Sequence, residues 1–309
     1  MLKLIINKQQ GKEISMINNN YTTEIYFFVD ELLKILEKTE LWVKLPKWNP
    51  NKSGMKKKMS LSEVITLNII RVLSHFKDLK AFHKNAYQYM KDYFPKMPNY
   101  ENFLKASNQS FQFLIIVLQV LLNISKYYAN NKLKAVDSTP LPVCKNKRIN
   151  RNKVCKGVAQ RGKTSLGWFY GFKLHGVCDI DGVLLSVTIT PGNIDDREVL
   201  SSLFNGINGT IIGDAGYLLK KEYWQKFFEE NKYLFTSVRN NMKKIMTKEQ
   251  HETLKKREII ETVWSVLKGN LSIVYSLARS IRGLFRHYLY SIIAYFFRYI
   301  NVNALLLEY

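Results

Sequence analysis

Two aspartates stand where apolar segments end, and their positions suit metal-dependent phosphate chemistry. Asp137 follows Ala-Val and Asp214 follows Ile-Ile-Gly, and each apolar run predicts a buried strand. Ligands in open α/β sheets bind beyond the carboxyl ends of strands, so both acids can face one crevice. Two carboxylates placed so close together repel one another unless a divalent cation lies between them. Mg²⁺ binds one or two carboxylates and keeps coordination positions for phosphate. The alternative is an acid that only caps a turn, because Asp-Ser-Thr-Pro is a good turn sequence.

A third acid, Glu261, lies on a predicted helix over residues 259–282. Arg257, Glu261, Trp264 and Lys268 are spaced by four, three and four residues, so they share one helix face. The simple interpretation is an amphipathic helix in which Arg257 and Glu261 pair. The functional interpretation puts Glu261 on the metal, while Arg257 and Lys268 hold DNA phosphates on either side of it.

The overall charge favours a polyanionic partner. The 309 residues contain 47 Lys and Arg against 25 acids, which gives a formal net charge of +22. Nucleic acid is the commonest polyanion for such a protein, although a basic protein without that role is the alternative. The apolar share of 46% and charged share of 23% exclude a disordered tail, a collagen-like fibre and a disulfide scaffold.

Much of the positive charge follows the first aspartate, because no acid occurs between Asp137 and Asp179. As a group these cations are expected to contact phosphates, while a solvated basic loop is the alternative for each one. Trp168, Phe169 and Tyr170 either stack on bases or lie in the core. The DNA-binding candidates here are Lys145, Lys147, Arg148, Arg151, Lys153, Lys156, Arg161 and Lys163, with Lys173 a further cation of the segment.

The hydrophobic pattern predicts an α/β protein with an all-α N-terminal region. Ser60-Leu-Ser-Glu63 is a capping box, so a helix should begin there. Three adjacent strands followed by alternation predict a mixed sheet flanked by helices. Helices are predicted at 22–37, 64–76, 80–93, 100–106, 110–128, 195–204, 219–230, 259–282 and 284–301, and strands at 134–136, 170–178, 183–190, 210–213 and 232–238.

Three cysteines and five histidines show no disulfide framework and no metal-ligand spacing, which fits a reducing, cytoplasmic setting. The first residues hold too short an apolar run for a signal peptide. The apolar stretches 111–122 and 288–297 fall below the roughly 18 residues that span a bilayer, so core helices are expected.

These motifs together resemble the DDE-type transposases of bacterial insertion sequences, and most closely insertion-sequence family 982, over residues 61–303. Asp137 in Val-Asp-Ser-Thr-Pro and Asp214 in Gly-Asp-Ala-Gly-Tyr match the first two motif acids, and residues 190–197 match the turn between them. Arg257, Glu261 and Lys268 fit the third-acid signature of the related insertion-sequence family 4. This sequence has Leu254 where that signature has a tyrosine.

The resemblance implies a ribonuclease-H-like catalytic domain at 131–309, after a helical region at 1–130 for terminal-repeat binding or dimerisation. It implies an endonuclease and polynucleotidyl transferase of a mobile genetic element. Asp137, Asp214 and Glu261 would be both catalytic and metal-ligating, with two Mg²⁺ or Mn²⁺ ions and Asp137 bridging them. The implied partners are double-stranded DNA, as terminal inverted repeats and target, and a second copy in a homodimer on DNA at the bacterial nucleoid, without a membrane.

Two other functions remain open at this stage. A nuclease of the same fold could cut without joining, and a transposase-derived protein could bind DNA without catalysis. The N-terminal helices are either a helix-turn-helix or a plain bundle. Lys56-Lys57-Lys58 precedes the capped helix, where it could contact the DNA backbone.

Overall fold

The computed structural model describes residues 19–48, 58–129, 132–165, 167–219, 221–237, 246–274 and 276–299. Two compact units make up the chain. The first, here the helical unit, comprises Met1–Val120 with Gly269–Tyr309, and the second, the sheet unit, comprises Leu121–Lys268.

The helical unit is built around one helix that is buried on all sides. This helix, α3 (Leu61–Leu73), begins at the predicted capping box: the Ser60 hydroxyl accepts from the Glu63 backbone N–H, and the Glu63 carboxylate accepts from the Ser60 N–H. Almost every residue of α3 is buried, so it is a core helix rather than an exposed recognition helix. The other helices of the unit are α1 (Asn19–Glu37), α2 (Glu40–Val43), α4 (Leu79–Tyr89), α5 (Tyr100–Gln109), the first part of α6 (Phe111–Tyr128) and α11 (Ile281–Tyr299), of which α1, α5 and α11 pack against α3.

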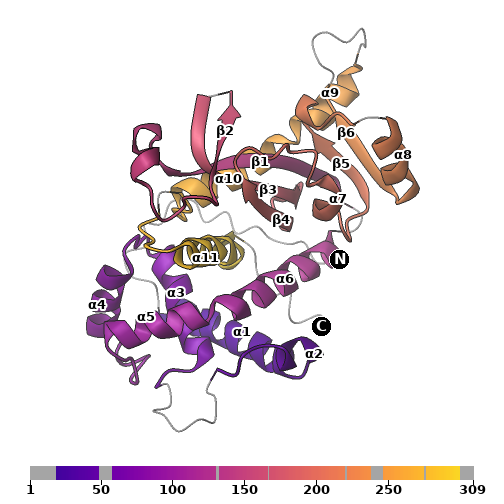
Figure 1. The fold of residues 1–309 in the computed structure, drawn as a ribbon. Coiled ribbons are helices and arrows are strands. Elements are labelled where there is room, and N and C mark those ends of the chain that lie inside the picture. The colour runs from indigo at the N-terminus through magenta and orange to yellow at the C-terminus, as the bar shows by residue number, and fades with distance from the viewer. Residues whose placement is uncertain are drawn as a thin grey trace. The chain divides into compact units, whose positions relative to one another are not determined.

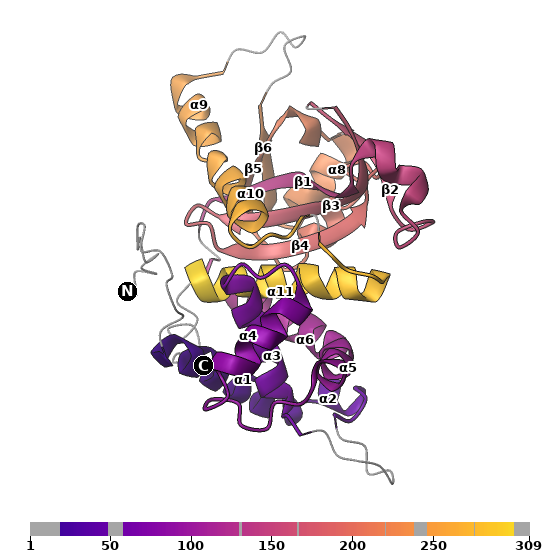
Figure 2. The same ribbon diagram turned by 90° about the vertical axis from the view of Figure 1, so that its left-hand side faces the viewer.

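The C-terminal helix α11 packs with these N-terminal helices (Figure 2). Buried polar contacts join them, since the Ser110 and Tyr290 hydroxyls lie 2.9 Å apart and Arg71 lies 3.3 Å from His287 Nδ1. The compact units therefore differ from the predicted domains 1–130 and 131–309, because residues 269–309 pack with the first unit. The functional assignment of those domains stays a prediction.

The sheet unit contains a mixed sheet (Figure 1). In it, β1 (Lys134–Cys144) is antiparallel to β3 (Gly167–Asp179), and β3 is antiparallel to β4 (Leu184–Pro191) and to β2 (Gln160–Thr164). On its other side β1 is parallel to β5 (Gly209–Gly213), which is parallel to β6 (Lys232–Thr236). This order and these directions are consistent with the expected ribonuclease-H-like fold.

The strands predicted at 170–178 and 183–190 are confirmed and pair as the hairpin of β3 and β4, with Gly182 in the left-handed region at φ +83° in the turn. The short strand predicted at 134–136 is wrong, because β1 continues to Cys144. Pairing with β5 is confined to Lys134 and Ala135, so beyond them one side of β1 is an edge. An edge tolerates Pro140 and Pro142, which lack a backbone N–H.

Two predicted helices are shorter than expected. The helix predicted at 195–204 is only α7 (Leu200–Leu203), because the Asp195 side chain accepts from the Arg197 backbone N–H and holds a turn. The helix predicted at 259–282 is α10 (Glu258–Gly269), and Ser272 then adopts a left-handed φ of 48°, which a right-handed helix cannot include. The other helical segments of the unit are the 3₁₀ turns η1 (Asn146–Arg151) and η2 (Ala215–Tyr217), α8 (Lys221–Glu229) and α9 (Lys248–Lys255).

Among the described residues one helix, α6, is long and apolar enough to cross a membrane by length and composition. Half of it is buried inside the structure, and core helices of soluble proteins pass the same test. A single such helix is weak support for a membrane span.

Candidate active site

Asp137 lies within β1, on the side of the sheet that helix α10 covers. Its Oδ2 accepts a hydrogen bond of 3.2 Å from the indole N–H of Trp264 on α10. The cross-strand neighbour of Asp137 on β3 is Gly176, and a Cβ there would lie 2.5 Å from the Trp264 ring. The missing side chain therefore lets the indole lie against the sheet and reach the carboxylate.

The environment of Asp137 disfavours its charged form. Burial raises the pKa of Asp137 to about 6, and the nearby charge of Asp214 adds to this effect. A hydrogen bond from the Ser138 backbone, the Arg257 charge and the Trp264 hydrogen bond act in the opposite direction. A carboxylate that is costly to ionise and faces a second acid is a favourable place for a cation.

Asp214 follows β5 directly and is exposed. Lys134 pairs with Ile211 and Ala135 with Ile212, and continuing this register puts Asp137 level with Asp214. The Asp214 carboxylate accepts from the Gly216 backbone N–H at 2.9 Å, which caps η2. The turn-capping contact expected as the alternative for Asp137 is found at Asp214 instead, because Asp137 lies within β1.

The predicted face of α10 is oriented toward Asp137. Trp264 bonds to it, the Arg257 charge lowers its pKa, and Asp137 in turn partly offsets the burial that lowers the pKa of Lys268. Glu261 is one turn before Trp264 on that face, so it lies on the same side of the sheet as Asp137. Its carboxylate pairs with Arg257 at 2.9 Å and is 55% exposed.

The donor set of these acids fits a divalent cation in part. Hard oxygen ligands suit Mg²⁺, which is commonly held by one or two carboxylates plus phosphate oxygens and water. Asp137 and Asp214 provide that pair. Within the described ranges no group of three Asp, Glu, His or Cys side chains is placed to hold a metal ion, which agrees with Glu261 being paired to Arg257. The same finding gives no support to a site made of the cysteines.

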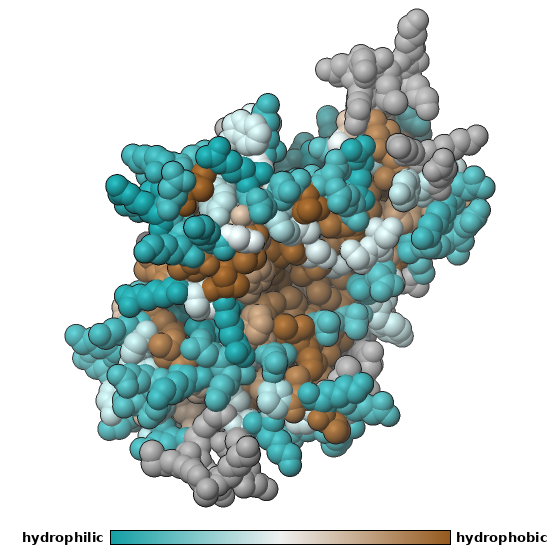
Figure 3. Space-filling model, viewed as in Figure 1, coloured by the Kyte–Doolittle hydropathy of each residue, from teal (hydrophilic) through white to brown (hydrophobic). Residues whose placement is uncertain are grey.

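The basic segment forms an exposed surface on η1, β2 and the loop between them, here the basic arm. Figure 3 shows mainly hydrophilic side chains over this region. Trp168 is 61% exposed, whereas Phe169 and Tyr170 are buried, which separates the two interpretations of this aromatic run. All eight DNA-binding candidates of the segment are exposed: Lys145, Lys147, Arg148, Arg151, Lys153, Lys156, Arg161 and Lys163.

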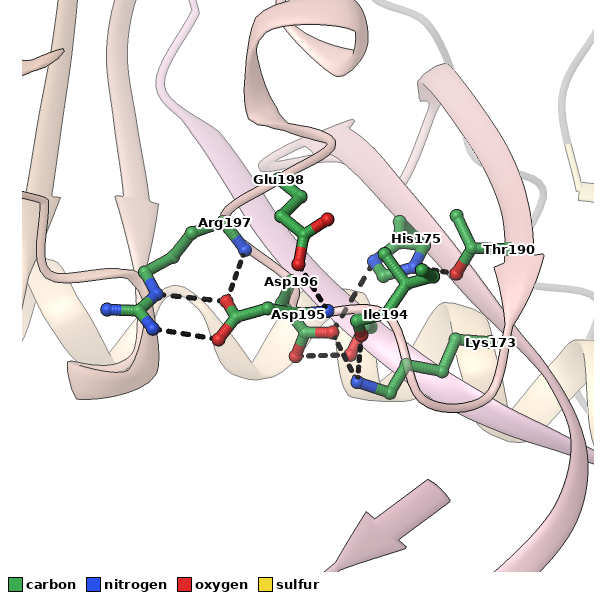
Figure 4. A network of polar contacts seen from close by, with 9 residues as sticks. Lys173, His175, Thr190, Ile194, Asp195, Asp196, Arg197 and Glu198 are labelled. Carbon is green, nitrogen blue, oxygen red and sulfur yellow. Dashed lines mark hydrogen bonds and ion pairs between the residues drawn. The ribbon is translucent and has the colours of Figure 1, made fainter. Parts of the chain in front are cut away.

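Lys173 differs from the other cations of the segment, because it is half-buried and pairs with Asp196 at 2.9 Å. Asp196 also accepts from the Ser138 hydroxyl at 2.8 Å, and His175 lies next to both (Figure 4). Sequence reasoning matched residues 190–197 to a family turn but assigned no role to Asp196. The signal that could have found it is the pair of adjacent aspartates after Thr-Pro-Gly-Asn.

Tyr217 closes the site from the β5 side. Its side chain is buried next to Ser138. Burial raises the pKa of Tyr217 well above its usual range, and the charges of Asp137, Asp196 and Asp214 add to the shift. Its phenol therefore lies within electrostatic range of all three aspartates.

Part of the chain matches a known protein family. Residues 128–281, which include Asp137, Asp214 and Glu261, match the family model described as a transposase DDE domain. No curated protein matches the chain. The match supports a DDE-type transposase, a polynucleotidyl-transferase-type enzyme, without assigning the chain to insertion-sequence family 982.

Proposed function

We propose that this protein is the DNA transposase of an insertion sequence, close to family 982, which cleaves the element's ends and joins their 3′-hydroxyls to target DNA. One observation carries the proposal. Asp137 lies close to Asp214, Arg257 and Trp264, and all four residues belong to a segment that matches a transposase DDE domain.

Each residue has a defined task in this proposal. Asp137 and Asp214 hold divalent cations between their carboxylates, and Glu261 joins them after releasing Arg257. Mg²⁺ or Mn²⁺ held there would supply positive charge where the attacking and leaving oxygens of the phosphodiester develop negative charge. Arg257 and Lys268 hold the phosphates on either side of the bond that breaks.

The pairing of Glu261 with Arg257 is easily exchanged. Glu261 is 55% exposed and Arg257 24% exposed. Ion pairs open to water contribute about 0–1 kcal/mol, because water screens them and long side chains lose freedom. A DNA phosphate therefore competes well for Arg257, and its arrival leaves the Glu261 carboxylate available beside Asp137. In this account DNA binding completes the ligand set.

The basic arm binds the DNA that leads into the site. Its cations are exposed, and the half-buried Lys173 is excluded from this role by its pairing with Asp196. Contact with about six phosphates gives log affinity a slope of about −5 against log salt. The DNA partners proposed are terminal inverted repeats and target DNA, with a homodimer on DNA in the bacterial cytoplasm.

A strand-transfer assay with a pre-cut transposon end tests the proposal. The DNA flanking the encoding locus supplies the inverted repeats for the substrate. Wild type should join the 3′-hydroxyl to a target plasmid only with Mg²⁺ or Mn²⁺, and Asp214→Asn should abolish joining. The matched control is Asp181→Asn, which changes an acid of the β3–β4 turn that pairs with Lys132.

The outcomes separate the alternatives. Metal-dependent cleavage without joining identifies a nuclease of the same fold. Tight binding to the repeats without cleavage identifies a DNA-binding protein that has lost catalysis. Joining that persists in Asp214→Asn contradicts the assigned site.

A further inference from the structure

We propose that Asp196 is a positioning residue for Asp137, acting through the Ser138 hydroxyl. The proposal rests on the function proposed above, because it concerns how the strand that carries the first acid is held in place. Asp196 belongs to the turn after β4, far from β1 in the sequence.

The contacts of Asp196 occupy both of its carboxylate oxygens. Oδ2 accepts from Ser138 Oγ at 2.8 Å. Oδ1 accepts from Lys173 Nζ at 2.9 Å (Figure 4). Lys173 also donates to the Ile194 carbonyl oxygen at 2.8 Å, which fixes the turn itself. With both oxygens used in this way, Asp196 is arranged to hold other residues rather than to ligate a cation.

The alternation of side chains along β1 separates Asp196 from the metal side of the sheet. Neighbouring residues of a strand point to opposite faces, so Ser138 points away from the face on which Asp137 meets Trp264. Asp196 binds Ser138 on that opposite face. The hydrogen bond therefore restrains the rotation of the strand at the residue next to Asp137.

This restraint acts where β1 lacks a neighbour on one side. The pairing of β1 with β5 covers Lys134 and Ala135 only, whereas the pairing with β3 continues along the strand. At Asp137 and Ser138 the described strand pairing is with β3, and the Ser138 backbone N–H also donates to the Asp137 carboxylate. Asp196 supplies a side-chain contact that compensates for the missing strand.

A buried histidine supports the network from β3. His175 is the cross-strand neighbour of Ser138, its Nε2 lies 2.8 Å from Thr190 Oγ1, and its Nδ1 lies 3.6 Å from Asp196 Oδ1. Burial lowers the pKa of His175 to about 4, so the ring is neutral near pH 7. Lys173 is therefore the cation that balances the charge of Asp196.

A spectroscopic test reads the position of Asp137 without metal or DNA. The indole N–H of Trp264 donates to Asp137, so its ¹⁵N–¹H signal, assigned with Trp264→Phe, reports on that carboxylate. Asp196→Ala and Ser138→Ala should both move this signal. The matched control Asp195→Ala should leave it in place, because Asp195 pairs with the exposed Arg197 instead.

A second measurement follows Mn²⁺ binding to the DNA-free protein by calorimetry. Loss of a residue that orients a metal ligand weakens metal affinity about 10–100-fold, so Asp196→Ala should do this and Asp195→Ala should not. The double variant Ser138→Ala/Asp196→Ala should bind no more weakly than Asp196→Ala, since Asp196→Ala already removes the Ser138–Asp196 hydrogen bond. Should Asp196→Ala fail to fold, Ser138→Ala and Asp196→Asn carry both measurements.

The proposal is overturned if folded Asp196→Ala and Ser138→Ala keep the wild-type Trp264 signal. The proposed function is contradicted if wild type neither binds Mn²⁺ nor cleaves DNA. If Asp196→Ala and Ser138→Ala still move the Trp264 signal in that case, the positioning role remains supported. The two failures are thus distinguishable.

Discussion

Replacing Asp137 with Asn should stabilise the metal-free protein at neutral pH. Burial raises the pKa of Asp137 from its ordinary value of 3.8 to about 6. The folded protein therefore binds this proton more tightly than the unfolded chain does. The stability that the proton contributes is complete below pH 3.8 and is lost as the pH rises to about 6.

The size of the effect follows from the shift. About two pKa units correspond to roughly 3 kcal/mol of unfolding free energy, which wild type loses between pH 4 and pH 7 through this group. Asn cannot ionise, and its amide oxygen can still accept from Trp264. The variant should therefore exceed wild type by up to about 3 kcal/mol at pH 7.5 and by little at pH 4.

Urea denaturation with EDTA, followed by tryptophan fluorescence at several pH values, measures the difference. Asp181→Asn serves as the control, because it makes the same change at an acid of the β3–β4 turn that pairs with Lys132. A variant that is less stable than wild type at pH 7.5, or a difference that does not change with pH, refutes the reasoning.

Three further predictions concern packing, DNA affinity and acid stability. Gly176→Ala places a Cβ 2.5 Å from the Trp264 ring, so it should cost about 1–3 kcal/mol of stability and reduce DNA cleavage; denaturation curves without a shift contradict this. Changing Lys145 and Arg148 together to Ala should make the slope of log DNA affinity against log salt less negative by about 2. Fluorescence anisotropy titrations measure this slope, and an unchanged slope means that the two residues are solvated and do not contact DNA. Burial lowers the pKa of His287 from 6.5 to about 3, so the neutral ring contributes stability above pH 6.5 that is lost as the pH falls toward 3. His287→Gln should flatten this acid branch, and an acid branch identical to that of wild type would exclude His287 as its source.

Local rules were enough for several elements. The capping box at Ser60 and the alternation on both sides of Asp179 depend on neighbouring residues, so α3 and the β3–β4 hairpin were predictable. The face shared by Arg257, Glu261 and Trp264 is likewise a matter of helix period; in the structure Trp264 donates to Asp137 and the Arg257 charge lies near it, while Glu261 pairs with Arg257.

What escaped prediction depends on distant partners. The length of β1 is decided by its pairing with β3, which overrides the turn propensity of Asp-Ser-Thr-Pro. Lys173 looks like the other cations of its segment, and only its contact with Asp196 sets it apart. The link from Asp196 to Ser138 spans 58 residues of sequence, and no spacing rule reaches that far.

Cation binding by the acids tests the central claim most directly. Mn²⁺ titrated into the DNA-free protein and followed by calorimetry should saturate in wild type. Asp137→Asn and Asp214→Asn should each abolish that binding, while Glu261→Gln should have its larger effect once DNA has engaged Arg257. Equal Mn²⁺ affinity in wild type, Asp137→Asn and Asp214→Asn would contradict the account.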